Sequence, residues 1–312
     1  MFVLRKKKVL FWSVLVLSFV LFGCGNEQES KNDGKINVVT TIAQIGEPLS
    51  VIGGDLLEVK SLMGPAVDPH LYKATHGDIR TMEEADLVFY NGLHLEANMV
   101  DIFKEMGKSK PVMGVAETIP EDLLLYDEYG SVDPHIWFDI DLWKQALHRA
   151  VEKLQEYAPK HRKTLEKNME AYFEELDQLK EDAKKLATIP EEKRVLITAH
   201  DAFGYFGRMH NIKVVGLQGL STDAEIGLSD IQDTIDIIIE YKVPAVFVES
   251  SVNEDAIRAV IEGAKQRGLE VSLGGELFSD AMGEPGTEKG TYIGMYRHNV
   301  DVIYKALNGG GN

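Results

Sequence analysis

The chain has one cysteine in 312 residues, Cys24. A single cysteine excludes an intramolecular disulfide and a metal site built from several thiolates. Four motifs are also absent: the phosphate-binding G-x-x-x-x-G-K-[ST], a dinucleotide-binding G-x-G-x-x-G after a strand, the zinc-protease H-E-x-x-H and the hydrolase G-x-S-x-G. These absences argue against the nucleotide-dependent and hydrolytic activities that those motifs support.

Positive charge is scarce beyond the N-terminus. Residues 1–23 contain four basic residues and no acidic one, and the remainder carries 29 Lys and Arg against 50 Asp and Glu, a formal net charge of −21. So acidic a surface argues against binding to nucleic acid or to an anionic membrane surface. It is compatible with a cationic ligand.

Residues 1–23 are typical of a targeting segment. The basic cluster 5–8 precedes a mostly apolar run of 14 residues, Val9–Phe22, which is short for a membrane span. The end of this run and the two residues after it form Leu21-Phe22-Gly23-Cys24, which resembles a bacterial lipobox, although Phe22 is bulkier than the usual residue there. The resemblance implies a lipoprotein signal peptide over 1–23, lipidation of Cys24 and a lipid-anchored flexible linker over 24–35.

Strand-like and helix-like segments alternate over 36–158 and again over 188–312. This alternation predicts βα units with mainly parallel sheets. Between the two regions, apolar residues recur at steps of three and four over 159–187, which indicates a single helix roughly 43 Å long. We therefore expect two α/β lobes bridged by a long, rigid helix that restricts lobe closure.

Four residues are candidate metal ligands. Asp-Pro-His occurs twice, at 68–70 and 133–135, and the proline and aspartate of each copy hold the following imidazole in a defined direction. His200 follows one predicted strand directly, and Asp280 follows another after a short turn. His70, His200 and Asp280 thus come at the carboxyl ends of strands, where parallel sheets bind ligands. Three imidazoles and a carboxylate can complete the coordination of a divalent transition metal.

The other six histidines fit structural roles, with His298 the strongest candidate among them for a further function. A secreted zinc hydrolase is the competing interpretation of the site. It requires an open coordination position and a general base near the metal, for which Glu249 or Glu276 at strand ends are the candidates.

Eight blocks of sequence, in order, resemble the metal-binding lipoproteins of bacterial ABC importers, the TroA-like zinc and manganese cluster of solute-binding proteins. They are the lipobox, MGPAVDPHLYKAT, VDPHIWFD, TAHDAFGYF, GLQGLSTD, FVESS, GGELFSDAMG and GTYIGMYRHN. The resemblance extends over about residues 36–307. It implies a metal buried between two lobes, with His70, His135, His200 and Asp280 as ligands. It also implies a monomer outside the cytoplasm that delivers its metal to a membrane permease coupled to an ATPase.

Features of this sequence point to different metals. The stretch 120–131 is short and has no histidine, unlike the long histidine-rich loop of many zinc-specific relatives. Two blocks, MGPAVDPHLYKA and GLQGLSTD, look most like manganese-associated members. His200 stands where many manganese-specific members have glutamate, and three imidazoles favour zinc by the Irving–Williams order. We expect Mn²⁺ as the cargo, with Zn²⁺ also able to bind. A zinc-specific protein remains the alternative, and nothing in the residues supports the adhesion attributed to some relatives.

Overall fold

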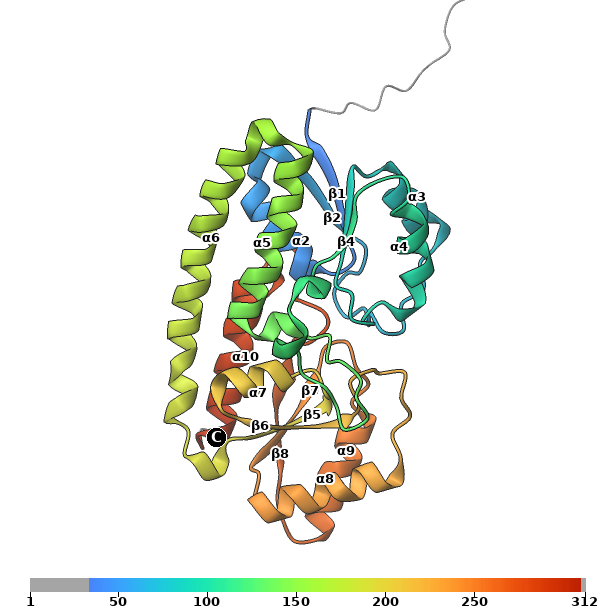
Figure 1. Ribbon diagram of the computed structural model, residues 1–312. Helices are drawn as coiled ribbons and strands as arrows, with labels where there is room; N and C mark the ends of the chain where they lie inside the picture. The colour runs from blue at the N-terminus through green and yellow to red at the C-terminus, as the bar shows by residue number, and fades with distance from the viewer. Residues whose placement is uncertain (1–33, 310–312) are drawn as a thin grey trace, which may run out of the picture. The chain divides into compact units, whose positions relative to one another are not determined.

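A computed structural model describes residues 34–309 (Figure 1). The signal peptide, Cys24 and nearly all of the linker lie outside these residues, so those predictions stay untested. From Ile36 onward the described chain forms one compact unit. No helix in the described range is long and apolar enough to cross a membrane.

The N-terminal lobe is built on a parallel sheet with the strand order β2-β1-β3-β4. Its strands are β1 (Ile36–Thr40), β2 (Leu57–Ser61), β3 (Leu87–Tyr90) and β4 (Val112–Gly114). Its helices are α2 (Ala43–Gly53), α3 (His76–Glu84), α4 (Val100–Met106) and α5 (Ile140–Tyr157). The central strands β1 and β3 are almost wholly buried, as expected for a parallel sheet covered on both faces.

The C-terminal lobe contains two pairs of parallel strands, β5 with β6 and β7 with β8. The strands are β5 (Val195–His200), β6 (Lys213–Gln218), β7 (Ala245–Glu249) and β8 (Ser272–Leu277), and the helices are α7 (Gly204–His210), α8 (Leu228–Tyr241), α9 (Asp255–Gln266) and α10 (Tyr292–Leu307). Strand β5 lies beside β7 without a ladder of backbone bonds. At this junction the Glu249 carboxylate accepts the backbone N–H groups of Ala199 and His200, at 3.1 and 3.3 Å.

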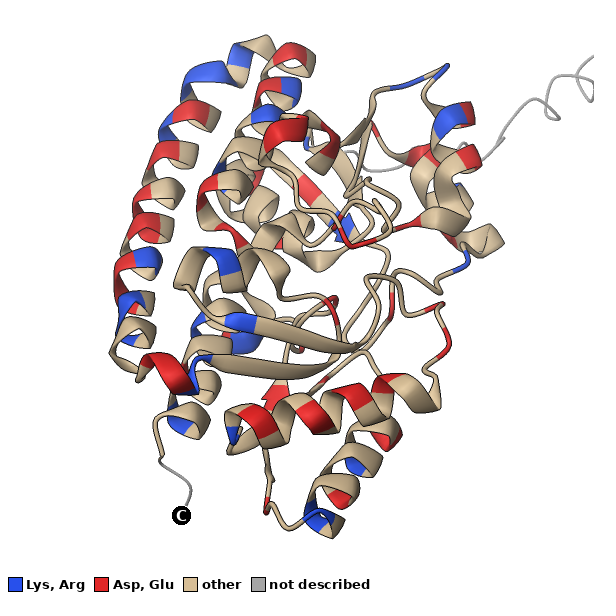
Figure 2. Ribbon diagram, turned by 60° about the horizontal axis from the view of Figure 1, so that its bottom comes forward, with Lys and Arg blue, Asp and Glu red and all other residues tan. Residues whose placement is uncertain are grey.

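The bridging helix is confirmed, but both of its ends are 3₁₀ turns rather than α-helix. Its α-helical part is α6 (Arg162–Ala183), flanked by 3₁₀ turns at Pro159–His161 and Lys184–Thr188. The predicted apolar stripe is its buried face, formed by Leu165, Met169, Tyr172, Leu176, Leu179 and Ala183. This face packs on α2 and α5 of the N-terminal lobe and on α10 of the C-terminal lobe, while charged residues of both signs cover its outer side (Figure 2). The predicted fold class, two mainly parallel α/β lobes joined by a long helix, is therefore confirmed.

Two strand ends differ from the sequence prediction. His200 is the last residue of β5 rather than the first residue after it, and β8 continues to Leu277, so the turn before Asp280 is shorter. His200 thus lies at the end of its strand, and Asp280 lies three residues beyond the end of its own.

Candidate metal centre

The two Asp-Pro-His copies form the same turn. In each copy the aspartate Oδ1 accepts the backbone N–H of the histidine two residues later, at 2.9 Å for both Asp68–His70 and Asp133–His135. In each copy the aspartate thus provides the hydrogen-bond partner of the histidine N–H and fixes the backbone position from which the imidazole extends. Both imidazoles are buried, His70 with 4% and His135 with 0% of its surface exposed.

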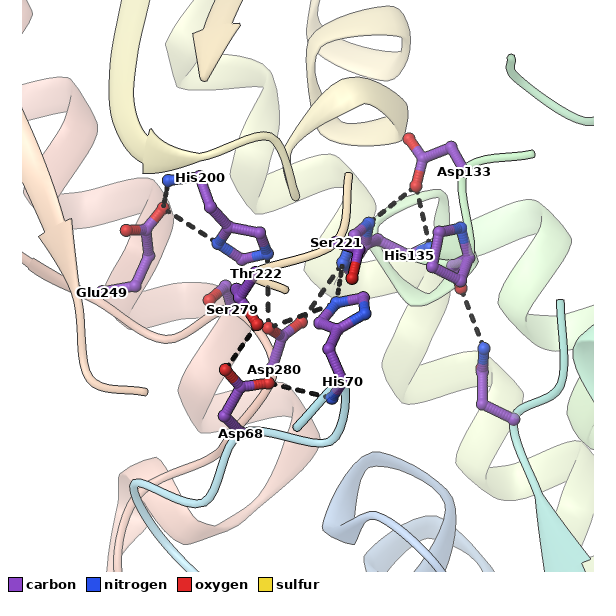
Figure 3. A network of polar contacts seen from close by, with 12 residues as sticks. Asp68, His70, Asp133, His135, His200, Ser221, Thr222, Glu249, Ser279 and Asp280 are labelled. Atoms are coloured by element: carbon purple, nitrogen blue, oxygen red, sulfur yellow. Dashed lines mark hydrogen bonds and ion pairs between the residues drawn. The ribbon is translucent and has the colours of Figure 1, made fainter. Parts of the chain in front are cut away.

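The two copies differ in what else the aspartate binds. Asp133 Oδ1 also lies 2.7 Å from Nδ1 of the His135 ring, which orients that imidazole and leaves its Nε2 directed into the site. Asp68 instead uses its Oδ2 to accept the hydroxyl of Thr222, at 2.5 Å, and makes no hydrogen bond to the His70 ring (Figure 3). The His70 ring is therefore less firmly oriented by its own loop.

The other two candidates come from the C-terminal lobe and are fully buried. His200 ends β5, and its ring has Glu249 behind it, with Oε1 3.6 Å from Nδ1. Asp280 follows β8, and neither of its carboxylate oxygens makes a hydrogen bond within the described chain. Its nearest polar neighbours are imidazoles, so this buried carboxylate calls for positive charge beside it, from protonated imidazoles or from a bound cation.

The structure brings all four candidates together, with one ligand atom from each within 4.8 Å of the others (Figure 3). Asp280 Oδ1 lies 3.3 Å from His135 Nε2, and Asp280 Oδ2 lies 3.3 Å from His200 Nε2 and 3.8 Å from His70 Nε2. Two atoms bound to one tetrahedral zinc ion are roughly 3.3–3.4 Å apart, given bonds of about 2.0–2.1 Å. The cluster therefore has the size of a single-ion site.

The surroundings of the cluster favour protonation of two of its three imidazoles, those of His135 and His200. Burial and the neighbouring imidazoles lower the pKa of His70 to about 3, which keeps it neutral. Burial has the same effect on His135, but the Asp133 and Asp280 carboxylates outweigh it and raise its pKa to about 9. Burial is outweighed in the same way at His200, chiefly by Asp280, and the His200 pKa lies well above its ordinary value. Burial opposes the ionisation of Asp280, yet the imidazoles hold its pKa well below the usual range. A divalent ion entering this site must displace protons.

Two asparagines that the sequence analysis missed support the histidine loops of the N-terminal lobe. Asn91 Nδ2 donates to the carbonyl of Pro134 at 3.0 Å, and Asn98 Nδ2 donates to the carbonyl of His70 at 3.1 Å. Both asparagines lie in the segment that follows β3. One loop therefore holds both Asp-Pro-His copies.

This loop has an unusual backbone. Gly92, Leu93 and His94 in succession have φ of 86°, 52° and 69°, a conformation that costs a non-glycine residue about 1 kcal/mol or more. The buried Glu96 carboxylate stabilises the turn by accepting the N–H groups of Asn91 and Gly92, at 2.8 and 3.0 Å. The cost of this conformation is thus offset by contacts that aim the asparagines at the ligand loops.

Asp280 is held by residues from both lobes. Gln44 of α2 donates to the carbonyl of Ser279 at 3.1 Å, and Asn299 of α10 bonds both the N–H and the carbonyl of Phe278, at 2.9 and 2.7 Å. These contacts involve residues separated in sequence by 21 or more positions. Local sequence patterns give no signal for them.

Residues proposed for a hydrolase are not placed for catalysis. Glu249 lies behind His200, where its carboxylate accepts backbone N–H groups, so the His200 ring separates it from the centre of the cluster (Figure 3). Glu276, the other candidate base, is exposed and is not one of the four clustered residues. His298, the strongest candidate among the other histidines, bonds the carbonyl of Glu276 at 3.0 Å and also lies outside the cluster. The arrangement fits ion binding rather than activation of a water molecule.

Comparison with known proteins agrees with the interpretation of the cluster as a metal-binding site. The chain matches the family model described as ZnuA, zinc-uptake complex component A, periplasmic, over residues 38–306. The manganese-binding lipoprotein MntA of Bacillus subtilis is 48% identical over 298 residues, covering 95% of this chain and 97% of that protein. The zinc-binding protein TroA of Treponema pallidum is 44% identical over 283 residues, covering 90% and 91%. The solved structure of periplasmic TroA superposes with a TM-score of 0.86 over 88% of this chain and 99% of that one.

Fold, site and relatives together define a solute-binding protein of the metal-uptake class rather than an enzyme. The match over most of its length shows that the chain belongs to the ZnuA family of uptake components, which confirms the resemblance found in the sequence blocks.

Proposed function

We propose that this protein captures one divalent transition metal ion per chain and delivers it to the permease of an ABC importer. The ligands are Nε2 of His70, His135 and His200 together with the Asp280 carboxylate. The observation that carries the proposal is the buried Asp280, whose two oxygens lack hydrogen bonds yet lie 3.3–3.8 Å from three imidazole nitrogens.

We propose Mn²⁺ as the physiological cargo. Both Asp280 oxygens face imidazole nitrogens, so the carboxylate can bind an ion through two oxygens and give it five ligand atoms. More than four ligands and an anionic oxygen donor suit Mn²⁺, whereas three imidazoles also suit Zn²⁺. The relatives are described as binding either metal, manganese for MntA and zinc for TroA. Zn²⁺ is therefore expected to bind the same four residues.

The remaining assignments follow from the family and from the N-terminal sequence. The protein acts as a monomer on the outer side of the bacterial cell membrane, anchored through lipidated Cys24 after removal of residues 1–23. The N-terminal lobe spans 36–158, the bridging helix 159–187 and the C-terminal lobe 188–312. The partners are a membrane permease and its cytoplasmic ATPase. Replacing Cys24 with serine should release the protein from the cell surface, and a Cys24→Ser variant that stays in the membrane fraction would argue against the anchor.

The metal assignment is tested by titration of the metal-stripped protein from Lys35 onward. We expect one Mn²⁺ or Zn²⁺ per chain, and each of His70→Ala and His200→Ala should weaken binding by more than ~100-fold, beyond the range seen for residues that merely support a ligand. Asp280→Asn should weaken Mn²⁺ more than Zn²⁺, because it removes the anionic oxygen donor. Near-normal affinity in both histidine variants would show that the ligands are wrong.

A further inference from the structure

The two most exposed large apolar side chains in the described part of the chain lie on two segments, one from each lobe. Tyr129, in the segment 120–131 that follows β4, is 86% exposed, and Leu228, the first residue of α8, is 84% exposed. Single apolar residues are common on protein surfaces, but at this exposure burial contributes almost nothing to folding. What surrounds these two side chains decides whether they serve an interaction.

Tyr129 lies at the tip of a short hairpin whose backbone is well bonded. Tyr126 and Val132 pair as an antiparallel bridge, and the Asp127 N–H donates to the carbonyl of Ser131 at 2.9 Å. The Oδ1 atom of Asp127 accepts the N–H groups of Tyr129 and Ser131, at 2.9 and 2.7 Å. The hairpin therefore presents the Tyr129 ring to solvent from a defined backbone, which lowers the entropy lost when a partner binds it.

The hairpin belongs to the N-terminal lobe in sequence, but it is also bonded to the C-terminal lobe. Arg208 of α7 donates to the carbonyl of Leu123 at 2.8 Å. The Tyr205 hydroxyl, also of α7, accepts the N–H of Leu125 at 3.0 Å. A molecule that binds the hairpin therefore contacts a segment that is held by both lobes.

The hairpin tip and the start of α8 lie close together. The carboxylate of Glu128, and more weakly those of Asp127 and of Asp230 on α8, raise the pKa of the Tyr129 hydroxyl above its ordinary value. Exposed charges more than about 10 Å apart are largely screened, so Asp230 lies near the tip. Leu228 is two residues from Asp230. The two exposed apolar side chains thus share one surface, to which both lobes contribute.

This surface is acidic on both sides. Residues 120–131 include four acidic and no basic side chains, and residues 219–233 include another four and again no basic one. Within the described range none of these eight carboxylates forms a salt bridge, and acidic residues continue along the outer face of α8 (Figure 2). On the bridging helix, in contrast, Asp177, Lys180 and Glu181 are paired with opposite charges. The surface thus carries unpaired negative charge around two apolar side chains.

We propose that the hairpin tip, residues 126–132, and the start of α8 form the surface that docks on the permease, with Tyr129 and Leu228 as its apolar anchors. Tyrosine is enriched among the residues that dominate binding energy at interfaces, because its ring is large, rigid and amphipathic. The complementary partner is a basic outer surface of the permease. A second copy of this acidic chain and an anionic membrane carry the same sign of charge and are repelled. This inference rests on the proposed function.

The test is the uptake of radioactive Mn²⁺ by cells that contain the native permease and carry a variant in place of the wild-type chain. The double variant Tyr129→Ala, Leu228→Ala should slow uptake about tenfold, as expected for the loss of interface anchors, while its Mn²⁺ affinity in titration stays at the wild-type value. Tyr129→Phe keeps the ring and should transport normally. Glu128→Lys should also slow uptake, because it reverses a charge on the surface and leaves both anchors in place. Tyr157→Ala is the matched control, since that exposed tyrosine bonds Asp86 at the opposite end of the N-terminal lobe.

Photocrosslinking in the same cells identifies what touches the tip. With benzoylphenylalanine in place of Tyr129, we expect a crosslink to the permease subunit. A crosslink only to lipid or to a second copy of the chain would overturn the docking surface, and so would wild-type uptake by both the double variant and Glu128→Lys. A wild-type chain that binds no metal, or whose deletion leaves Mn²⁺ uptake unchanged, would instead overturn the proposed function itself.

Discussion

The two Asp-Pro-His loops have the same three residues and the same turn, yet the structure uses them differently. At 133–135 the aspartate binds the imidazole ring, and the backbone is held by Tyr205 of the opposite lobe and by Asn91 of its own lobe. At 68–70 the aspartate binds a threonine across the lobe boundary and leaves the ring to its contacts in the site. The comparison shows that a ligand motif gives a direction to a side chain, while the surrounding fold decides how firmly that direction is kept.

The largest expected difference between the loops concerns their aspartates. Asp133→Asn removes the carboxylate that orients His135, and metal affinity should fall by ~10–100-fold, the usual effect of losing a residue that supports a ligand. Asp68→Asn should cost less than about tenfold, because its partner Thr222 can still bond an amide. Isothermal titration of both variants with Zn²⁺ measures the difference. Equal losses would contradict the unequal roles of the two loops.

Proton competition provides a second test of how the carboxylates act on the site. The carboxylates raise the pKa of His135 to about 9 and hold the pKa of His200 well above its ordinary value, so both imidazoles are protonated at neutral pH and must lose a proton to bind metal. Affinity should therefore rise with pH up to about 9, by about tenfold per pH unit for each proton displaced. Titrations in buffers of different ionisation enthalpy count the protons released. Affinity that stays constant between pH 6 and 8 would be inconsistent with these shifts.

Tyr205 allows a milder test of how the second loop is held. Its hydroxyl donates to the Asp133 carbonyl and accepts the Leu125 N–H at 3.0 Å, so Tyr205→Phe leaves one buried and one partly buried backbone group without this partner. The free energy of unfolding should fall by about 1–2 kcal/mol in urea denaturation. Tyr157→Phe is the control, since its hydroxyl bonds Asp86 at the surface, and its effect should be within about 0.5 kcal/mol. Equal stability of Tyr205→Phe and wild type would weaken the case for a fixed second loop.

The smallest effect is expected for the lobes as a whole. Helix α6 packs on both lobes and contains no glycine or proline between Arg162 and Ala183, so it offers no local hinge. Metal binding should accordingly leave the radius of gyration nearly unchanged in small-angle scattering. A decrease of the size seen in flexibly hinged binding proteins would show that the helix bends.

Much of the fold and all four clustered residues could be predicted from the sequence, because their signals are local. The alternation of strands and helices, the apolar stripe of the bridging helix and the paired tripeptides are each legible within a few residues. Histidines at strand ends meet because parallel strands end at the same edge of a sheet. His200 and Asp280 were therefore placed in the right region, although His200 proved to belong to its strand.

The residues that support the site could not be predicted in the same way. Asn91 reaches Pro134 across 43 positions, Tyr205 reaches Asp133 across 72, and Thr222 reaches Asp68 across 154. Asparagine, tyrosine and threonine are common in loops and helices, and their composition does not reveal which distant backbone they bond. Their roles follow from tertiary packing alone, which is also why the unequal anchoring of the two loops was not foreseen.

The central claim is that one metal ion binds between His70, His135, His200 and Asp280. Diffraction from crystals grown with Mn²⁺ or Zn²⁺, recorded on both sides of the absorption edge of the metal, tests it most directly. We predict one strong anomalous peak per chain, about 2.0–2.2 Å from Nε2 of each histidine and from the Asp280 carboxylate. A peak bound by other residues, or no peak among these four in metal-saturated protein, would contradict the assignment.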